Sequence, residues 1–133
     1  MAPEIAYLEA EEIVELNLLV LGLVPAKKAD KHEVLSRGKL LQAIEKCREA
    51  QGGVYDKAAA LMRALTAAHA FASGNRRTAF LAAKEFVQRN DGKFAIPDNP
   101  DYASIMREIR EGKHADEEIA EWIRNGKINK AKR

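Results

Sequence analysis

Residues 69–79 of the chain read HAFASGNRRTA, and they span the junction between two segments whose apolar residues recur at helical spacing. The first segment covers residues 54–71, and the second begins at residue 76 or 77 and runs to about residue 89. Between them, the Ser73-Gly74 pair is typical of a tight turn, because glycine adopts backbone conformations that other residues avoid. The sequence therefore predicts two helices in the middle of the chain, joined by a short glycine-containing turn.

The chain on either side of this unit is also helical in pattern. Four more segments fit helices, one of them with Ser36 as its N-cap, and they cover residues 9–23, 36–50, 102–111 and 115–124. The segment 9–23 is apolar almost all round, so we expect it to be buried on more than one side. Only residues 28–35 leave room for a short β-hairpin flap. The fold class predicted is all-α, a compact bundle of about six helices.

Size and composition fit a single globular domain. The chain has 133 residues, 47% of them hydrophobic and 32% charged, which predicts one domain over residues 1–133 and excludes a disordered chain. Lys and Arg number 22 against 20 Asp and Glu, so the net charge of +2 marks no polyanion-binding surface by itself. Residues 125–133 are basic, and we expect a frayed tail there.

Several function classes are excluded by what the chain lacks. Cys47 is the only cysteine, which rules out a disulfide framework and a cysteine-based zinc site. The N-terminus has no basic segment ahead of an apolar one, and the most apolar run, residues 13–24, is too short to span a membrane. We therefore expect a cytoplasmic protein without a membrane partner.

The turn at residues 69–79 carries the chemistry. Arg76 and Arg77 lie in the first turn of a predicted helix, where the positive end of the helix dipole disfavours cations. Guanidinium groups beside helix-start amides form a site for a multiply charged anion, and Gly74 lets the backbone approach it. His69 lies nearby as a candidate base. An anion site beside a base favours transfer of a phosphoryl or nucleotidyl group to a hydroxyl.

The same residues carry a family resemblance. The pattern His-x-Phe-x-acid-small-Asn-x-Arg, continued by Thr-Ala, is met here at His69, Phe71, Gly74, Asn75, Arg77, Thr78 and Ala79. This stretch resembles the signature of the Fic/Doc (Fido) family, above all its Doc (death-on-curing) toxin-like branch. Residues 36–44 also look like a helix common in Doc-like proteins, and the resemblance covers about residues 5–95.

The resemblance implies a role for each matched position. His69 would be the catalytic base that takes the proton from a hydroxyl of a target protein. Phe71 and Thr78 would support the motif structurally. The nucleotide phosphates would be bound by Gly74, Asn75, Arg76 and Arg77. The family further implies a nucleoside triphosphate such as ATP with Mg²⁺, a target that in the known case is a translation factor, and a separate antitoxin chain.

Two positions depart from the family pattern. Ser73 stands where the family has the acid that holds Mg²⁺, and Phe80 stands where AMP-transferring members have a second arginine. Phe80 favours Doc-like phosphate transfer to Ser or Thr, with AMP transfer as the alternative. Ser73 also leaves open a degenerate, non-catalytic module that binds an anion or a partner. Residues 104–108 resemble a Fic inhibitory helix but lack its final Gly or Asn.

Two plainer interpretations stay open at this point. Arg76 and Arg77 could be solvated surface charges. The basic tail could indicate association with nucleic acid, although no stacking aromatic residues accompany it, so we do not expect a nucleic-acid partner. The sequence gives no indication of the oligomeric state.

Overall fold

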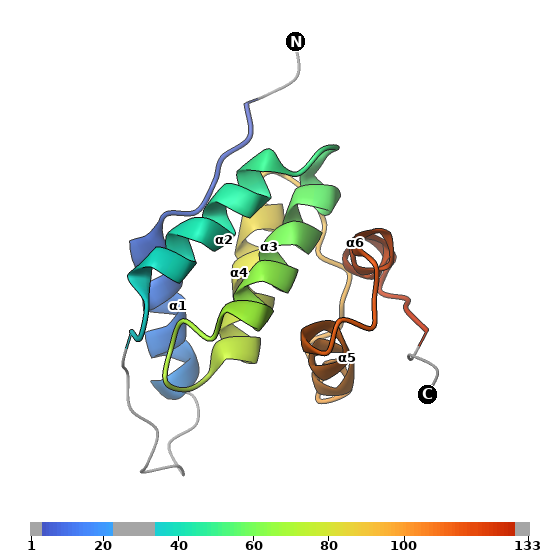
Figure 1. Cartoon of the computed structure of the whole chain (residues 1–133). Helices are drawn as coiled ribbons and strands as arrows, with labels where there is room; N and C mark the ends of the chain where they lie inside the picture. Colours follow the sequence, from blue (N-terminus) through green and yellow to red (C-terminus); the bar gives the residue numbers. More distant parts are fainter. Residues whose placement is uncertain (1–3, 23–33, 130–133) are drawn as a thin grey trace.

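The protein is a bundle of helices (Figure 1). The computed structural model describes residues 4–22 and 34–129. Within these ranges the chain forms six α-helices and no sheet, so the predicted all-α class is confirmed. The helices are α1 (Ala10–Gly22), α2 (Arg37–Glu49), α3 (Val54–Ala68), α4 (Asn75–Arg89), α5 (Tyr102–Arg110) and α6 (Asp116–Asn125).

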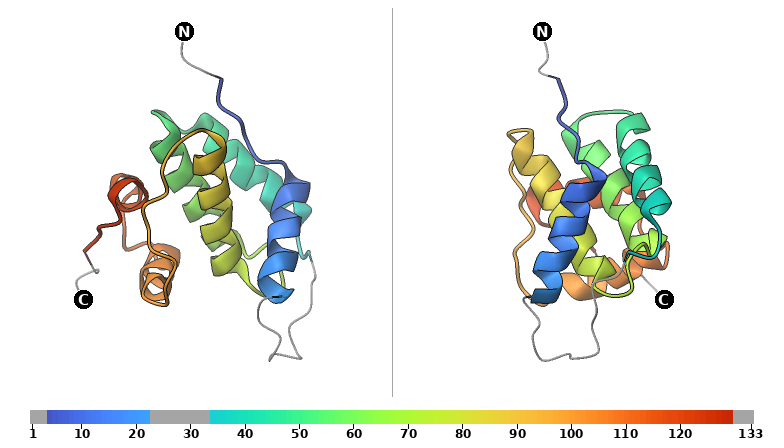
Figure 2. Two further views of the ribbon diagram at one scale, coloured as in Figure 1. Left: turned by 180° about the vertical axis from the view of Figure 1, so that it is seen from behind. Right: turned by 90° about the vertical axis from the view of Figure 1, so that its left-hand side faces the viewer.

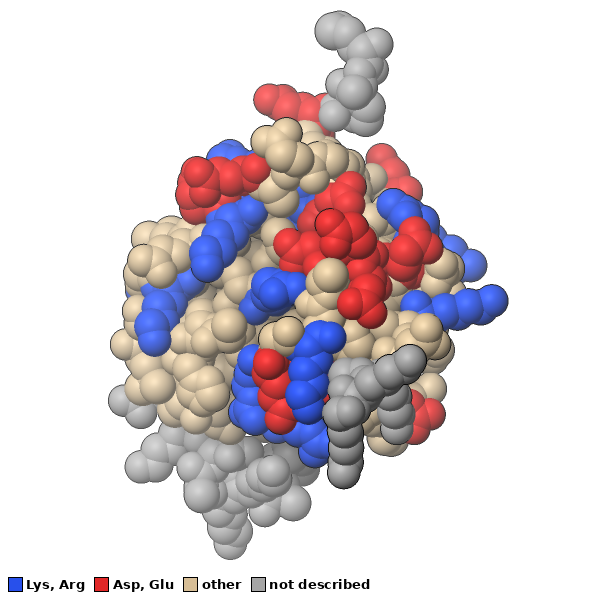
Figure 3. Space-filling model, turned by 45° about the vertical axis from the view of Figure 1, so that its right-hand side comes forward, with Lys and Arg blue, Asp and Glu red and all other residues tan. Residues whose placement is uncertain are grey.

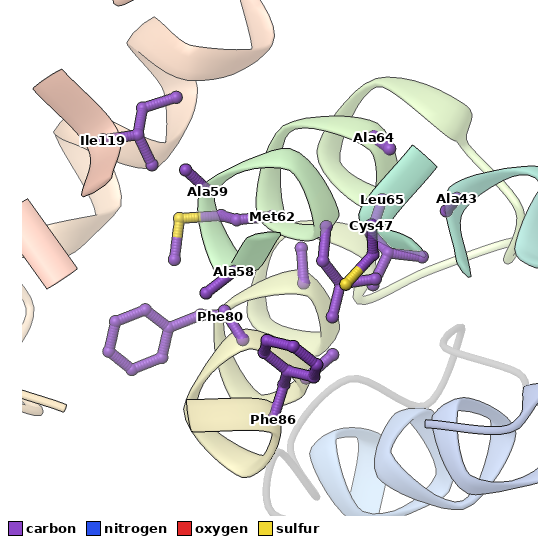
Figure 4. Packing of buried hydrophobic residues seen from close by; sticks show 14 of the residues in the cluster. Ala43, Cys47, Ala58, Ala59, Met62, Ala64, Leu65, Phe80, Phe86 and Ile119 are labelled. Carbon is purple, nitrogen blue, oxygen red and sulfur yellow. The ribbon is translucent and has the colours of Figure 1, made fainter. Parts of the chain in front are cut away.

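Helix α3 lies at the centre and packs against α2, α4, α5 and α6. Its buried side chains are mostly small or flexible, among them Ala58, Ala59 and Met62, none of which is exposed to solvent. Small side chains let neighbouring helices approach closely, and Figure 4 shows them beside Phe80 and Phe86 of α4. Helices α1 and α2 lie on one side of the α3–α4 pair, and α5 and α6 lie on the other (Figures 1 and 2).

The structure corrects the predicted end of the third helix. Helix α3 ends at Ala68, three residues before Phe71. His69 follows in the left-handed conformation, with φ 52° and ψ 46°, which stops the helix. The backbone of Phe71 instead forms an isolated antiparallel bridge with Val34, and the carbonyl of Ala70 accepts the N–H groups of Leu35 and Ser36. Most of the expected flap at 28–35 lies outside the described residues.

One further expectation is changed by the packing. Helix α1 buries one face, through Ile13, Val14, Asn17 and Val20, but Leu18 and Leu19 are half exposed, so the expectation of burial on several sides was wrong. The apolar pattern alone does not reveal which side of a helix is left without a neighbour.

Residues 125–129, at the start of the predicted basic tail, belong to the described part of the chain. Asn125 is the last residue of α6, and the N–H of Gly126 donates to the carbonyl of Trp122 at 2.7 Å. Ile128 packs against the core, whereas residues 130–133 lie outside the described part. In the described ranges, each helix is too short or too polar to cross a bilayer.

Candidate functional site

The loop between α3 and α4 is held by its own side chains. The Asn75 carboxamide bonds the Phe71 backbone twice, because its oxygen accepts from the Phe71 N–H at 3.0 Å and its nitrogen donates to the Phe71 carbonyl at 2.8 Å. The Phe71 ring is buried in the core. The two ends of the turn are thus fixed to each other, and His69 is left on the outside with an exposed side chain.

Helix α1 supports the loop from behind through Asn17, which has no exposed surface. Its amide nitrogen donates to the Ser73 carbonyl at 2.9 Å and to the Thr78 hydroxyl at 3.1 Å. Its amide oxygen is buried without a hydrogen-bond partner among the described residues. Sequence reasoning did not assign this role, although an amide inside the apolar run 13–24 was the available signal, because a buried polar group requires partners.

Gly74 is required by backbone conformation and by α1. It precedes α4 with φ 77° and ψ 17°, a left-handed conformation that glycine adopts at no steric cost. A Cβ at this position would lie 3.2 Å from both the amide nitrogen of Asn17 and a methyl group of Val20. The missing side chain therefore permits the close approach of α1, in addition to any close approach of a ligand.

The first turn of α4 presents amides and cations together. The Gly74 carbonyl accepts the N–H of Thr78, so the N–H groups of Asn75, Arg76 and Arg77 precede the first intrahelical bond. The side chains of Arg76 and Arg77 are exposed. Both the amides and the dipole of α4 favour a negative charge at this end.

A cavity of about 410 Å³ lies over this turn and brings the predicted residues together. Its lining includes Thr66 and Val20 from the helices behind it, and from the motif His69, Ser73, Gly74, Asn75, Arg76 and Arg77. No Asp or Glu among the described residues lines it. Its chemistry is that of a cationic pocket with one imidazole at its wall.

Arg110 also lines this cavity, and sequence reasoning missed it. It lies in the last turn of α5, whose buried residues Ile105, Met106 and Ile109 pack the helix against the core. No short motif in the sequence signals this role, because Arg110 lies more than 30 residues beyond the motif and reaches the cavity only through the packing of α5. The cavity thus gains a third guanidinium from a separate element.

The donors at this cavity do not fit a protein-held Mg²⁺. The family's acidic position is Ser73, and a hydroxyl is a much weaker ligand for a hard cation than a carboxylate. In the part of the chain that the structure describes, no three His, Cys, Asp or Glu residues are grouped so as to hold a metal. Anionic oxygens are a better match than a cation for the guanidinium groups found here.

Other reactive side chains lie away from the cavity. His114 is buried, with Nε2 at 2.8 Å from Glu108 and Nδ1 at 3.4 Å from Glu118, and it joins the end of α5 to the start of α6. Cys47 lies on the buried face of α2, and burial raises the pKa of its thiol to about 12. Neither side chain is placed to act on a ligand in the cavity.

The fold and the site together describe a helical protein with a cationic pocket at the start of its fourth helix. The sequence model of the Fic/DOC family matches residues 7–87, which is more than half of the chain. The chain therefore belongs to the Fic/DOC family, whose members are typically transferases. No curated protein matches the chain.

Proposed function

We propose that this protein is a Doc-like transferase that moves phosphate from a nucleoside triphosphate, with ATP as the expected donor, to a Ser or Thr hydroxyl of a target protein. The observation that carries the proposal is the cavity in which one exposed imidazole, His69, and three guanidinium groups meet, and which no carboxylate of residues 4–22 or 34–129 lines. Figure 3 shows that Lys and Arg side chains lie beside Asp and Glu side chains on one face of the molecule.

In the proposed reaction His69 removes the proton from the target hydroxyl. The oxygen then forms a bond to the terminal phosphorus, and the bond from that phosphorus to its bridging oxygen breaks. The products are a phosphorylated Ser or Thr and a nucleoside diphosphate, and the proton passes from His69 to solvent. The left-handed backbone at His69 places the imidazole at the cavity rim instead of on the helix surface.

The phosphates are proposed to bind where α4 begins. Helix-start amides and the Arg77 side chain form charge-assisted hydrogen bonds to phosphate oxygens, and Arg76 and Arg110 add charge from two sides. Because catalysis of phosphoryl transfer is mostly positioning and charge stabilisation, these groups are the main contribution of this chain. No step is assigned to a metal ion here, since the donors at the cavity do not fit one.

Phosphate transfer is favoured over AMP transfer by Phe80. This residue occupies the position of the second arginine, and its ring is buried and stacked on Tyr102 with centroids 4.0 Å apart. The position is therefore part of the core and offers no cation to a phosphate. The other candidate function, a non-catalytic module that binds an anion or a partner, is favoured by Ser73 alone. A separate antitoxin chain remains a prediction of the family resemblance.

The proposal is tested by incubating the protein with ATP labelled at either the γ or the α phosphate, in an extract that supplies the target. We expect γ label on protein hydroxyls, and His69→Ala should lower the rate of labelling about 100-fold or more. Arg107→Ala, which changes an exposed residue of α5 outside the cavity, should label protein at nearly the wild-type rate.

The other outcomes separate the candidates. Label from the α position would show AMP transfer instead. If the wild type transfers no label while Ser73→Asp does, the present chain is the non-catalytic module. Equal labelling by wild type and His69→Ala would remove His69 as the base.

A further inference from the structure

The last turn of α5, which carries Arg110 to the cavity, is fastened by the short link that leads to α6. In this link the N–H groups of Glu111, Gly112 and Lys113 donate back to carbonyls in the last turn of α5. The link lies beyond residues 7–87, the part of the chain that the family model matches, so the match assigns nothing to it. A group that holds this link therefore also holds Arg110.

The buried ring of His114 holds the link to both helices. The His114 side chain is 1% exposed, and each ring nitrogen faces a carboxylate. Nε2 lies 2.8 Å from Glu108 of α5, and Nδ1 lies 3.4 Å from Oε2 of Glu118 of α6. The other oxygen of Glu118 accepts the Ala115 N–H at 2.9 Å. One imidazole thus bridges the end of α5 and the start of α6.

The remaining charges around this bridge come from α3 and from the link itself. Arg63 of α3 donates to the His114 carbonyl and forms an ion pair with Asp116. On the surface of the link, Lys113 pairs with Glu111 at 3.3 Å. These charges are matched in opposite pairs. The charge of the ring itself therefore decides how well it binds the two carboxylates that face it.

A proton on the ring determines how many carboxylates it can bind. An imidazolium donates from both nitrogens, whereas a neutral imidazole has one N–H and one lone pair. A neutral His114 can therefore donate to only one carboxylate, and its lone pair faces the other. Glu118 is 49% exposed and more distant from the ring, whereas Glu108 is 14% exposed and closer, so the neutral ring keeps Glu108 and releases Glu118.

A cavity separates α5 from α6 at the ends opposite to His114. It has a volume of about 270 Å³, and Tyr102 and Ile105 of α5 line it together with Trp122 of α6. Helix α5 packs against α3 and α4, and α6 packs against α3 (Figure 1). Space beside α5 at one end and a single bridging ring at the other allow the helix to tilt about its last turn.

We propose that His114 is a positioning residue through which pH controls the contribution of Arg110 to the cavity. The protonated ring binds Glu108 and Glu118 together and holds Arg110 in place. The neutral ring releases Glu118, so the affinity for a polyphosphate falls as pH rises through the titration of His114. Histidine ordinarily titrates near neutral pH. The inference rests on the proposed function, because it regulates the anion site which that function requires.

Glu118→Gln is the variant that removes the need for a proton. Its amide oxygen can accept the Ala115 N–H, and its amide nitrogen can donate to a neutral Nδ1, so the bridge stays closed at every pH. Glu117→Gln removes the same charge from the neighbouring exposed position of α6 and is the control. Both variants also carry His69→Ala, which removes the imidazole at the cavity wall, and circular dichroism checks that they keep their helices.

The first measurement is a calorimetric titration with inorganic triphosphate at intervals between about pH 5.5 and about pH 8.5. The ratio of the two affinities cancels the titration of the triphosphate. We expect Glu118→Gln and Glu117→Gln to bind equally in acid, and Glu118→Gln to bind about threefold more tightly at the alkaline end. A ratio that stays constant across this range would overturn the proposal.

The second measurement follows the protein without ligand by nuclear magnetic resonance. In the His69→Ala protein, the side-chain Cδ–H signals of Arg110 should shift with the same midpoint as the ring signals of His114. In the Glu118→Gln variant the Arg110 signals should stay constant. Arg110 signals that do not follow His114, or a His114 ring that keeps one protonation state across the range, would contradict the positioning role.

These readings do not depend on turnover. If Arg110 follows His114 and no γ label is transferred to protein, the positioning role stands and the proposed reaction fails. If γ label is transferred while both readings stay flat, the reaction stands and the role of His114 fails. If triphosphate binds at no pH, the phosphate site fails, and the Arg110 signals alone decide the role of His114.

Discussion

At the scale of single residues, the cavity depends on side chains that do not touch its contents. Asn17 and Asn75 hold the loop from two directions, one from α1 and one from within the turn. Gly74 allows α1 to lie against the same loop. The position of His69 and of the α4 amides is therefore set by polar contacts behind the cavity. A substitution that removes these contacts should both destabilise the protein and displace the residues that line the cavity.

Replacing Asn17 by Leu should destabilise the protein. The change keeps the side-chain volume similar but leaves the Ser73 carbonyl and the Thr78 hydroxyl without this donor, at a cost of about 1–3 kcal/mol in the free energy of unfolding. Urea denaturation measures it. Gln88→Leu, which replaces an exposed amide side chain of α4, is the control and should change little. A variant at Asn17 as stable as wild type would show that the amide contributes nothing to the loop.

Two glycines should respond to alanine in opposite directions. Gly74→Ala places a residue with a Cβ in the left-handed conformation and against α1. We therefore expect the free energy of unfolding to fall by about 1–2 kcal/mol. Gly38→Ala lies inside α2, where the nearest atom to an added Cβ is 3.8 Å away, and should stabilise the protein by about 0.5–1 kcal/mol. Thermal unfolding of both variants checks this, and equal effects would contradict the assigned backbone strain.

At the scale of elements, α1 is attached to α4 at both of its ends. Near its start, the Glu12 carboxylate accepts two hydrogen bonds from Arg89, one of them 3.0 Å long. Near its end, Asn17 and Val20 meet the loop before α4. The loop between α3 and α4 is therefore held between α1 and α4, which are distant in the sequence.

The Glu12–Arg89 pair predicts a pH dependence. The hydrogen bond from Arg89 lowers the pKa of Glu12, so its stabilisation is present above the usual carboxyl range and is lost as pH falls through the lowered pKa. Glu12→Gln should lower the free energy of unfolding by less than about 1 kcal/mol at neutral pH, because the pair is partly exposed. The substitution should not change this free energy once the carboxyl is protonated. Urea unfolding at neutral and acidic pH, with the exposed Glu15→Gln as control, measures this. A cost that persists in acid would contradict it.

The helices could be predicted, but not all of their ends. Periodicity placed all six, and Ser36 caps α2 as expected, with its hydroxyl accepting from Lys39 N–H at 3.2 Å. The end of α3 was misplaced because it depends on two contacts of the Phe71 backbone. One is the bridge to Val34, which is distant in the sequence, and the other is the side chain of Asn75, four residues further on. Local propensity carries no information about such contacts.

At the scale of the whole molecule, the cavity is assembled from segments that are distant in the sequence. The motif supplied His69, Arg76 and Arg77 and could be recognised from the sequence. Arg110 could not be, because its place depends on α5 packing across the α3–α4 pair. The segment after residue 87, which the family model does not match, thus contributes to the same cavity.

Removing Arg110 should weaken anion binding. Three guanidinium groups at one cavity attract a polyanion. Arg110→Ala should therefore lower the affinity for inorganic triphosphate about fivefold to tenfold at low salt, and less at high salt. Arg107→Ala removes the same charge from α5 outside the cavity and is the control. Equal losses in both variants would mean that only overall charge matters.

The most direct measurement is a nuclear magnetic resonance titration of the ¹⁵N-labelled protein with inorganic triphosphate. We expect the largest shifts at the backbone amides of residues 74–77, with shifts at the side-chain Nε–H of Arg77 and Arg110. If these signals stay unchanged while the shifts fall on the lysines of α2, such as Lys39 and Lys46, the phosphate site at the start of α4 does not exist.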